Sequence, residues 1–417
     1  MKMKNMMHYQ KNKLMIEEAS IQSIVKKWGT PLYLYSHAQI KKNWDVFSGA
    51  CRGSKHLICY ALKANSNLGI IKLFSKLGAG FDIVSQGELE RVLLAGGDPQ
   101  KIIFSGVGKT SAEIKRALEV GIFCFNIESV PELERISAIA KSARIIAPIA
   151  LRVNPHIPID SHPYITTGLK HNKFGIAMSE SIEAYRYAKR LPFLKIKGLA
   201  CHLGSQINEI TPFIIGLEKL LNLLEKLKKQ NIELDFLDMG GGVGIPYRNE
   251  KTVDVKKYIS ALYKKMNKYS KTLVLEPGRA LIGNAGVLIT KIEYIKKTKT
   301  KNFAIVDTAM NDLMRPALYQ AWHQIMPVEK RTSAKATYDV VGPVCETGDF
   351  LGLDRPLSIK PDDLLAICDV GAYGFALGSN YNSRLRPAEV LVSGKKLIPL
   401  RKRETYSDLW RKEFLEF

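Results

Sequence analysis

Leu57-Ile-Cys-Tyr-Ala61 is an apolar run that ends shortly before a lysine, and a second run, Gly80-Phe-Asp-Ile-Val84, follows it. Stretches with helical spacing of apolar residues alternate with such runs as far as residue 275. The predicted strands are residues 57–61, 80–84, 101–104, 123–127, 149–153, 196–201, 235–239 and 273–275. The clearest predicted helices between them are residues 86–95, 112–120, 131–140 and 213–229.

This alternation predicts the fold class. Strands that alternate with helices along a chain form parallel sheets. Eight such units between residues 57 and 275 predict a closed (β/α)8 barrel of the TIM type. A doubly wound open sheet is the alternative that the same rhythm leaves open.

The pattern changes after Gly283. Strand-like runs now stand between Gly- and Pro-containing segments, and only residues 310–324 keep a helical period. Pro31-Leu-Tyr-Leu-Tyr35 is also strand-like, and we expect it to join the same sheet. We therefore predict a barrel domain over residues 37–282 and a mostly antiparallel β domain built from residues 1–36 and 283–417. The later predicted strands are residues 287–294, 303–307, 338–341, 364–368 and 389–392.

The chain of 417 residues is strongly basic, with 62 Lys and Arg against 40 Asp and Glu and a net charge of +22. Such a balance is typical of nucleic-acid-binding proteins. The lysines are scattered, however, as in Glu225-Lys-Leu-Lys-Lys229, and aromatic residues are not interleaved with the basic clusters. We therefore interpret the charge as a solvated surface and expect no nucleic-acid partner.

The cysteines argue for a reduced compartment. The six of them include no C-x-x-C pair and none close to a pair of histidines, so we expect neither a disulfide scaffold nor a metal site. The basic first residues are followed by too short an apolar run for a signal peptide, and no stretch approaches the roughly 18 apolar residues of a membrane span. We expect a soluble cytoplasmic protein that has no membrane partner.

Polar residues follow most of the predicted strands. In a (β/α)8 barrel the carboxyl ends of the strands surround one mouth, where the chemistry takes place. The motifs there are Lys63-Ala-Asn65, Arg152-Val-Asn154, Cys201-His-Leu-Gly-Ser205, Gly240-Gly-Gly-Val-Gly244 and Glu276-Pro-Gly-Arg279, and Asp82 lies within the second strand. Their common placement predicts a single site.

Each motif has a structural and a chemical interpretation. Lys63 is either a lysine extending from a strand edge or an amine in a dry pocket, where burial frees the nucleophile. The glycine run is either a sharp turn or an anion cradle of backbone N–H groups. Glu276 and Arg279 form either a local ion pair or partners for a ring nitrogen and an anion. His202 is either a core histidine or a side chain that stacks on a planar ring.

Gly108-Lys-Thr110 looks like the end of a phosphate-binding loop. That motif requires a glycine five residues before its last glycine, and position 103 is Ile. We therefore reject this interpretation, and Thr110 with Glu113 instead predicts a helix capping box.

Taken together, the motifs resemble the diaminopimelate decarboxylase family, within the alanine-racemase-like class of pyridoxal-phosphate (PLP) enzymes. The resemblance covers residues 29–386. The motifs that carry it are Tyr60-Ala-Leu-Lys-Ala-Asn65, His202-Leu-Gly-Ser-Gln206, Gly240-Gly-Gly242, Glu276-Pro-Gly-Arg279, Gly342-Pro-Val-Cys-Glu346 and Gly371-Ala-Tyr-Gly374. Further similar stretches are Arg152-Val-Asn-Pro155, Tyr164-Ile-Thr-Thr-Gly168 and Lys173-Phe-Gly-Ile176.

The resemblance implies a role for each residue of the site. The catalytic residues would be Lys63, Cys345 and His202. Lys63 would carry PLP covalently, Cys345 would return a proton, and His202 would stack on the ring. The remaining cofactor-binding residues would be Ser205, Gly241, Gly242, Glu276, Pro277, Gly278, Arg279 and Tyr373. Substrate would be bound by Arg279, Arg315, Tyr319, Glu346 and Tyr373. We expect Lys63 and Glu276 at opposite strand ends of the mouth.

The resemblance also implies the reaction and the assembly. The reaction would be decarboxylation of meso-2,6-diaminopimelate to L-lysine and CO2, the last step of lysine biosynthesis, and the assembly a homodimer with shared sites. An ornithine- or arginine-type decarboxylase of the same fold is the alternative. Two departures from the family pattern occur. Thr347 stands where Ser is usual, which keeps the hydroxyl, and Gly278-Arg-Ala-Leu-Ile282 lacks the usual aromatic residue.

Overall fold

The computed structural model describes residues 6–158 and 173–415 of the chain. It divides into two compact units. One contains Met1–Asn43, Pro246–Glu250 and Leu281–Phe417, and the other contains Trp44–Ile245 and Lys251–Ala280. We call the second the barrel unit and the first the β unit.

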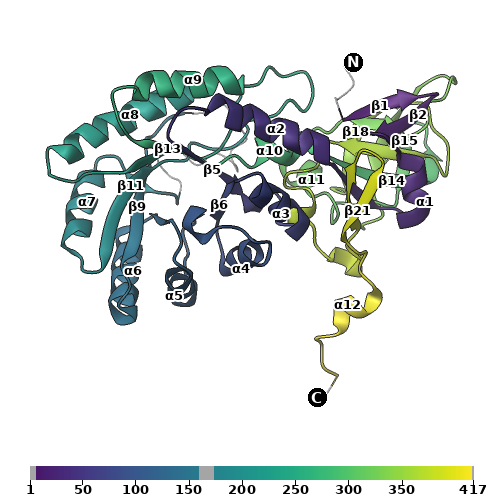
Figure 1. Cartoon of the computed structure of the whole chain (residues 1–417). Helices are drawn as coiled ribbons and strands as arrows, with labels where there is room; N and C mark the ends of the chain where they lie inside the picture. The colour runs from purple at the N-terminus through teal and green to yellow at the C-terminus, as the bar shows by residue number, and fades with distance from the viewer. Residues whose placement is uncertain (1–5, 159–172, 416–417) are drawn as a thin grey trace. The chain divides into compact units, whose positions relative to one another are not determined.

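The barrel unit is built on a ring of parallel strands (Figure 1). In the described part of the chain the ring has eight strands, and the β8–β9 and β13–β5 pairings close it. This confirms the predicted (β/α)8 barrel, and the open-sheet alternative is wrong. The strands are β5 (His56–Ala61), β6 (Gly80–Ile83), β7 (Ile102–Phe104), β8 (Cys124–Ile127), β9 (Ala147–Asn154), β11 (Leu194–Ala200), β12 (Phe236–Asp238) and β13 (Thr272–Leu275).

Helices follow the strands and lie outside the ring (Figure 1). Two of these helices begin with a serine cap. Ser85 Oγ and Ser129 Oγ each accept a hydrogen bond from a backbone N–H in the first turn of the helix that follows. Thr110 and Glu113 form the predicted capping box. The helices of this layer are α3 (Leu68–Lys76), α4 (Gln86–Leu94), α5 (Ser111–Val120), α6 (Val130–Ala143), α7 (Ser181–Arg190), α8 (Thr211–Lys228) and α9 (Val255–Met266), and α2 (His37–Ala50) precedes β5.

The inside of the barrel is filled by side chains. A buried cluster of Cys59, Ile103, Cys124, Ala150, Phe236 and Val274 occupies its amino-terminal end. A Cβ on Gly198 would collide with the Phe236 ring, so the large ring is accommodated only because its neighbour has no side chain. A packed interior leaves no room for a ligand, so the strand ends must carry the chemistry.

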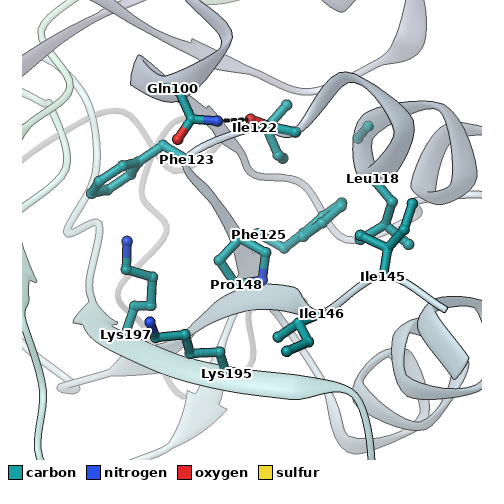
Figure 2. A pocket seen from close by; sticks show the side chains of 12 residues that line it. Gln100, Leu118, Ile122, Phe123, Phe125, Ile145, Ile146, Pro148, Lys195 and Lys197 are labelled. Carbon is teal, nitrogen blue, oxygen red and sulfur yellow. Dashed lines mark hydrogen bonds between the residues drawn. The ribbon is translucent and has the colours of Figure 1, made fainter.

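A cavity of about 360 Å³ lies outside this end of the barrel. Figure 2 shows apolar side chains of Leu118, Ile122 and Ile145 along one side and Lys195 and Lys197 along the other. Lys197 Nζ lies 4.6 Å from the centroid of the Phe123 ring. The cavity is formed at the amino ends of β8, β9 and β11, away from the carboxyl ends of the strands.

The β unit contains a mostly antiparallel sheet, as predicted. Its order is β18-β17-β15-β14-β4-β20-β21, with β19 (Leu364–Cys368) also paired to β14. The predicted N-terminal strand joins it as β4 (Leu32–Ser36). The other strands of this path are β14 (Gly286–Lys297), β15 (Asn302–Val306), β17 (Ala336–Val341), β18 (Phe350–Leu357), β20 (Ala388–Ser393) and β21 (Lys396–Arg401).

Several small elements were not expected from the sequence. A hairpin-like sheet precedes helix α1 (Ile21–Trp28), and β10 (Ile176–Ala177) extends the pairing of β9. Strands β18 and β21 escaped prediction because prolines, and in β18 a glycine, interrupt their apolar pattern. The short sheet consists of β1 (Met7–Gln10), β2 (Lys13–Ile16) and β3 (Ala19–Ser20), and β16 (Ile325–Pro327) pairs with β19.

The helix predicted over residues 310–324 is much shorter than expected. Only α11 (Arg315–Tyr319) forms, with Pro316 in its first turn. Pro316 favours a start at this point, and Gln320, which adopts a left-handed conformation at φ 51°, ends the helix. Of the helices that the structure describes, none is both long and apolar enough to cross a membrane.

Candidate active site

Lys63 lies at the barrel mouth, in a single 3-10 turn (Leu62–Ala64) that directly follows β5. Its ammonium group donates a hydrogen bond to Asp82 Oδ2 and forms an ion pair with it. The Lys63 side chain is 35% exposed, whereas Asp82 is fully buried. Since Ala61 and Asp82 are register partners in β5 and β6, the barrel pairing itself brings the carboxylate beneath the amine.

Two more carboxyl groups lie close to this pair. Asp238 ends β12 and Glu276 follows β13. The Asn126 side-chain amide contacts both, with Nδ2 3.1 Å from Asp238 Oδ2 and 3.4 Å from Glu276 Oε1. The Gly240 N–H donates to Asp238 Oδ1 at 2.8 Å. The mouth therefore contains Asp82, Asp238 and Glu276, which we call the carboxyl cluster.

Burial raises the pKa of Glu276 well above its usual value, and the negative charges of Asp238 and Asp82 add to this, while Lys63 opposes it. Burial also raises the pKa of Asp238, to about 6, although hydrogen bonds from its neighbours hold it down. The hydrogen bond between these two carboxyl groups raises the pKa of Glu276 and lowers the pKa of Asp238. Glu276 therefore holds the proton, and Asp238 accepts the bond.

His202 follows β11 and is kept neutral. Burial lowers its pKa well below the usual value, and the positive charges of Arg152 and Lys63 act in the same direction. The Gly241 N–H donates to His202 Nδ1 at 3.1 Å, so the ring proton is on Nε2. A Cβ on Gly240 would lie 2.7 Å from this ring nitrogen, which explains a glycine at that position.

The segment after β13 crosses close to the Lys63 turn. A Cβ on Gly278 would lie 3.0 Å from the Ala64 Cβ, and the Pro277 carbonyl accepts a bond from the Ala61 N–H at 3.3 Å. Arg279 is buried and donates from Nη2 to Ser205 Oγ at 2.9 Å. The barrel mouth thus gathers Lys63, His202, Ser205, Gly241, Gly242, Glu276, Pro277, Gly278 and Arg279.

One expectation about this arrangement is wrong. Lys63 and Glu276 were expected at opposite strand ends, but β13 and β5 are hydrogen-bonded neighbours. The first and last strands of a closed barrel must pair with each other, so residues far apart in sequence become adjacent.

Sequence reasoning placed Asp82 at the mouth without giving it a role, and it did not consider Asp238 or Asn126. The signal that could have found them is a polar residue inside an apolar strand that is buried on both faces. Such a group is costly to bury unless it is paired. All three are at most 2% exposed.

Two predicted motifs meet beside the mouth. Arg152 Nη1 donates to Glu128 Oε1 at 2.7 Å, and Glu128 Oε2 accepts from the Gly175 N–H at 2.8 Å. The Arg152 guanidinium also lies over the Phe174 ring, 4.9 Å from its centroid. These contacts join Arg152-Val-Asn154 to Lys173-Phe-Gly-Ile176, whereas the Tyr164–Gly168 motif lies outside the described residues.

The remaining predicted residues belong to the β unit. Arg315 and Tyr319 lie one turn apart on α11, and Arg315 is buried. Arg315 Nη1 lies 2.8 Å from His323 Nε2, and His323 Nδ1 lies 2.8 Å from the Cys368 carbonyl. The carbonyl can only accept, so His323 carries its proton on Nδ1 and accepts from Arg315 on Nε2. This chain of bonds fixes the orientation of the Arg315 guanidinium.

Cys345 and Glu346 lie on an exposed turn of the β unit. The Asp349 carboxylate holds the turn, because it accepts from the Val344 N–H at 2.7 Å and from the Met310 N–H at 2.6 Å. The Tyr381 hydroxyl donates to Glu346 Oε1. The thiol and the carboxylate are therefore presented to the outside of the unit by an ordered turn.

Tyr373 adopts a left-handed backbone conformation, with φ 57°. It lies between Gly371 and Gly374, and a Cβ on either glycine would collide with neighbouring backbone. The tight turn accounts for an unfavourable conformation at a tyrosine, and such conformations are concentrated at functional sites.

The comparisons with known proteins agree with this site. Residues 37–283 match the family model described as pyridoxal-dependent decarboxylase, pyridoxal binding domain. The chain therefore belongs to the pyridoxal-dependent decarboxylases, and its cofactor is pyridoxal 5'-phosphate.

Within that family the chain belongs to the diaminopimelate decarboxylases. The diaminopimelate decarboxylase of Vibrio cholerae is 51% identical over 408 residues, covering 97% of this chain and 98% of the relative. That of Pseudomonas aeruginosa is 50% identical, covering 98% of each chain.

Solved structures agree. The Helicobacter pylori diaminopimelate decarboxylase complexed with L-lysine has a TM-score of 0.91 at 42% identity, over 94% of this chain and 98% of that one. The Vibrio vulnificus lysine/ornithine decarboxylase complexed with putrescine has a TM-score of 0.79 at 20% identity, over 90% and 97% of the two chains, which shows a shared fold alone.

The raised pKa of Glu276 predicts a pH-dependent stability for the apo protein. The folded state keeps this proton at pH values where the unfolded chain, with a pKa near 4.5, has released it. The free energy of unfolding should therefore fall as pH rises from about 5 to 8, and Glu276→Gln should remove part of that fall. At pH 8 the variant should be more stable than wild type, because its folding does not require a proton to be taken up at this position.

Urea unfolding of apo protein at several pH values measures this effect. Glu225→Gln, on the exposed face of α8, is the matched control and should leave the curve unchanged. Equal pH dependence in wild type and Glu276→Gln would show that Glu276 does not hold the proton.

Proposed function

We propose that this chain decarboxylates meso-2,6-diaminopimelate to L-lysine and CO2, as the last step of lysine biosynthesis. The observation that carries the proposal is an acid-paired lysine and a buried glutamate that follow neighbouring strands at the mouth of the barrel. Similarity to diaminopimelate decarboxylases over nearly the whole chain supports the substrate. We further propose that the enzyme acts in the cytoplasm as a homodimer, and we retain residues 37–282 as the cofactor domain.

The residues of the mouth suit PLP. Asp82 Oδ1 and Asn126 Oδ1 are buried and have no hydrogen-bond partner among the described residues. The mouth therefore contains two acceptor oxygens that a bound group could use. A Cβ on Gly240, Gly241 or Gly242 would collide with neighbouring atoms, so the backbone of the run carries no side chain that could block a phosphate. When bound, PLP supplies a ring that accepts the electrons released as the α-carboxylate leaves.

Each side chain of the mouth then has a defined task. Lys63 would anchor the cofactor, and Asp82 would take up the proton that the ammonium must lose to become a nucleophile. Glu276 would face the ring nitrogen, with Pro277 shaping the turn that follows. Neutral His202 would pack on the ring face without adding charge.

The phosphate would be held by donors that converge from three strand ends. Gly242 would offer a backbone N–H group at the β12 end, whereas the Gly241 N–H already donates to His202 Nδ1. Gly241 and Gly278 would allow close approach, because a Cβ at either position would crowd neighbouring atoms. Ser205 and Arg279 are already bonded to each other and would contribute a hydroxyl and a guanidinium. Tyr373 would add a further hydroxyl from the β unit.

The substrate carries two carboxylates and two amines, which defines the polar groups that it needs. Arg279 and Arg315 would pair with carboxylates, and Tyr319 would contribute a hydroxyl. Glu346 would bind the distal amine, and Cys345 would return a proton to the α-carbon. Because Cys345 and Glu346 lie on an exposed turn, we propose that they complete the site of the partner subunit.

A substrate panel tests the proposed reaction. CO2 release should be fastest with meso-diaminopimelate and should require PLP, whereas ornithine, arginine and lysine should be poor substrates because they lack the second carboxylate. The measurement is kcat/KM for each amino acid with and without added PLP. Preference for ornithine or arginine would assign the chain to the other substrate class and leave the fold and cofactor untouched.

Lys63→Ala should abolish the covalent attachment of the cofactor. The variant should lose the visible absorption band and the borohydride-fixed label, and decarboxylation should fall by at least about 100-fold, the lower range for a positioned proton-transfer group. Lys72→Ala, at an exposed position on α3, is the control and should keep band, label and rate. Retention of the label by Lys63→Ala would place the anchor elsewhere.

Mixed dimers test the shared site. Lys63→Ala and Cys345→Ala protomers should each be inactive, but their mixture should recover roughly a quarter of wild-type activity, because half of the dimers are mixed and each has one intact site of two. The assay is CO2 release after subunit exchange verified by differently tagged protomers. If exchange occurs and activity does not return, each site is built within one subunit.

A further inference from the structure

A second cavity, of about 410 Å³, lies in the β unit. Ile325, Met326 and Leu357 supply apolar surface, and Trp322 and Tyr9 also line it. Its volume is in the range of small-molecule sites. None of the residues that line it has a role in the proposed decarboxylation.

The charge of this cavity is one-sided. The described residues that line it include Lys330, Arg331, Lys335 and Arg355 and no Asp or Glu. Arg331 is neutralised, since it forms a bidentate pair with Asp363 at 2.5 and 2.8 Å. The other three cations form no ion pair with the described part of the chain.

Arg355 is the unusual member of this group. It is only 8% exposed, and its Nε finds no hydrogen-bond acceptor among the described residues. A buried cation without a carboxylate costs stability, and proteins rarely keep one without a use for it. Burial, with the charge of Arg248 added, lowers its pKa to about 10, so the guanidinium stays charged at neutral pH.

Aromatic rings hold the cations in place. The Arg355 guanidinium lies 4.5 Å from the centroid of Trp322, and Arg248 lies 5.7 Å from the same ring. Lys330 Nζ lies 4.0 Å from the centroid of Tyr9, whose hydroxyl donates to the Pro327 carbonyl at 2.5 Å. Cation–π contacts orient these groups and leave their N–H donors available.

We propose that this cavity binds a phosphate monoester that carries an aromatic or apolar body. The Arg355 fork would take the phosphate oxygens, with Lys330 and Lys335 at the rim adding charge. The body would lie on the floor of Ile325, Met326 and Leu357. The site is an addition to the proposed function, because it uses none of the residues of the barrel mouth.

Calorimetric titration of the holoenzyme, freed of unbound PLP, tests the proposal with AMP and pyridoxine 5'-phosphate as probes and adenosine as the uncharged comparison. We expect saturable binding of at least one probe with a dissociation constant below about 1 mM, and none of adenosine. Whichever probe binds more tightly identifies the preferred body. Binding weaker than this for both probes, or equal binding of adenosine, would overturn the proposal.

Arg355→Met separates a ligand-binding arginine from a structural one. Removing an unpaired buried charge should leave the melting temperature unchanged or higher. Probe binding should nevertheless weaken by roughly 10-fold or more, as expected for a lost charged hydrogen bond. Arg52→Met, at an exposed position of the barrel unit, is the matched control and should bind as wild type does.

Lys330→Ala gives an independent reading, because Lys330 is exposed and its loss should not disturb folding. It should weaken binding by a few-fold and reduce the salt dependence. CO2 release should be unaltered in both variants. Unchanged probe binding in Arg355→Met would refute the site, whatever the decarboxylase activity shows.

Discussion

The hydrogen-bonded closure of the barrel is the constraint on which the rest of this protein depends. The β13–β5 and β8–β9 pairings join the ends of the sheet, so all eight carboxyl ends surround one mouth. The packed interior below, with Phe236 beside Gly198, leaves that mouth as the place where polar groups can meet. Lys63 and Glu276 are more than two hundred residues apart in sequence, and the closure makes their strands neighbours.

Electrostatics within the mouth follow from that geometry. Three carboxyl groups lie near a single lysine, and they cannot all ionise at low cost in a buried setting. Each carboxyl group of the cluster instead has a different partner or protonation state. Asp82 pairs with Lys63, Asp238 accepts hydrogen bonds, and Glu276 keeps its proton. A glutamate whose pKa is raised by burial suits the ring nitrogen of the cofactor, because it can supply a proton to that nitrogen.

Much of the fold could be predicted from the sequence, and the reasons are local. The eight barrel strands are short, mostly apolar runs, which is the pattern of strands buried on both faces, and their boundaries lie within two residues of the prediction. The β unit was harder. Its strands β18 and β21 contain prolines, and the stretch over residues 310–324 has a helical period but forms only α11. In each case a proline or a left-handed residue outweighed the pattern of apolar side chains.

By itself, the sequence determined the strand–helix alternation, the motifs at the strand ends and the family. Spacing and residue type are sufficient for these, because they depend on neighbours along the chain. The tertiary structure decided which polar side chains meet. Asp82 and Asp238 lie inside apolar strands, and their partners Lys63 and Asn126 come from other elements of the barrel. The Trp322 ring that contacts Arg355 likewise lies outside the strand of Arg355. The pKa of Glu276 and the unpaired charge of Arg355 arise from burial among residues distant in sequence, which only the folded chain brings together.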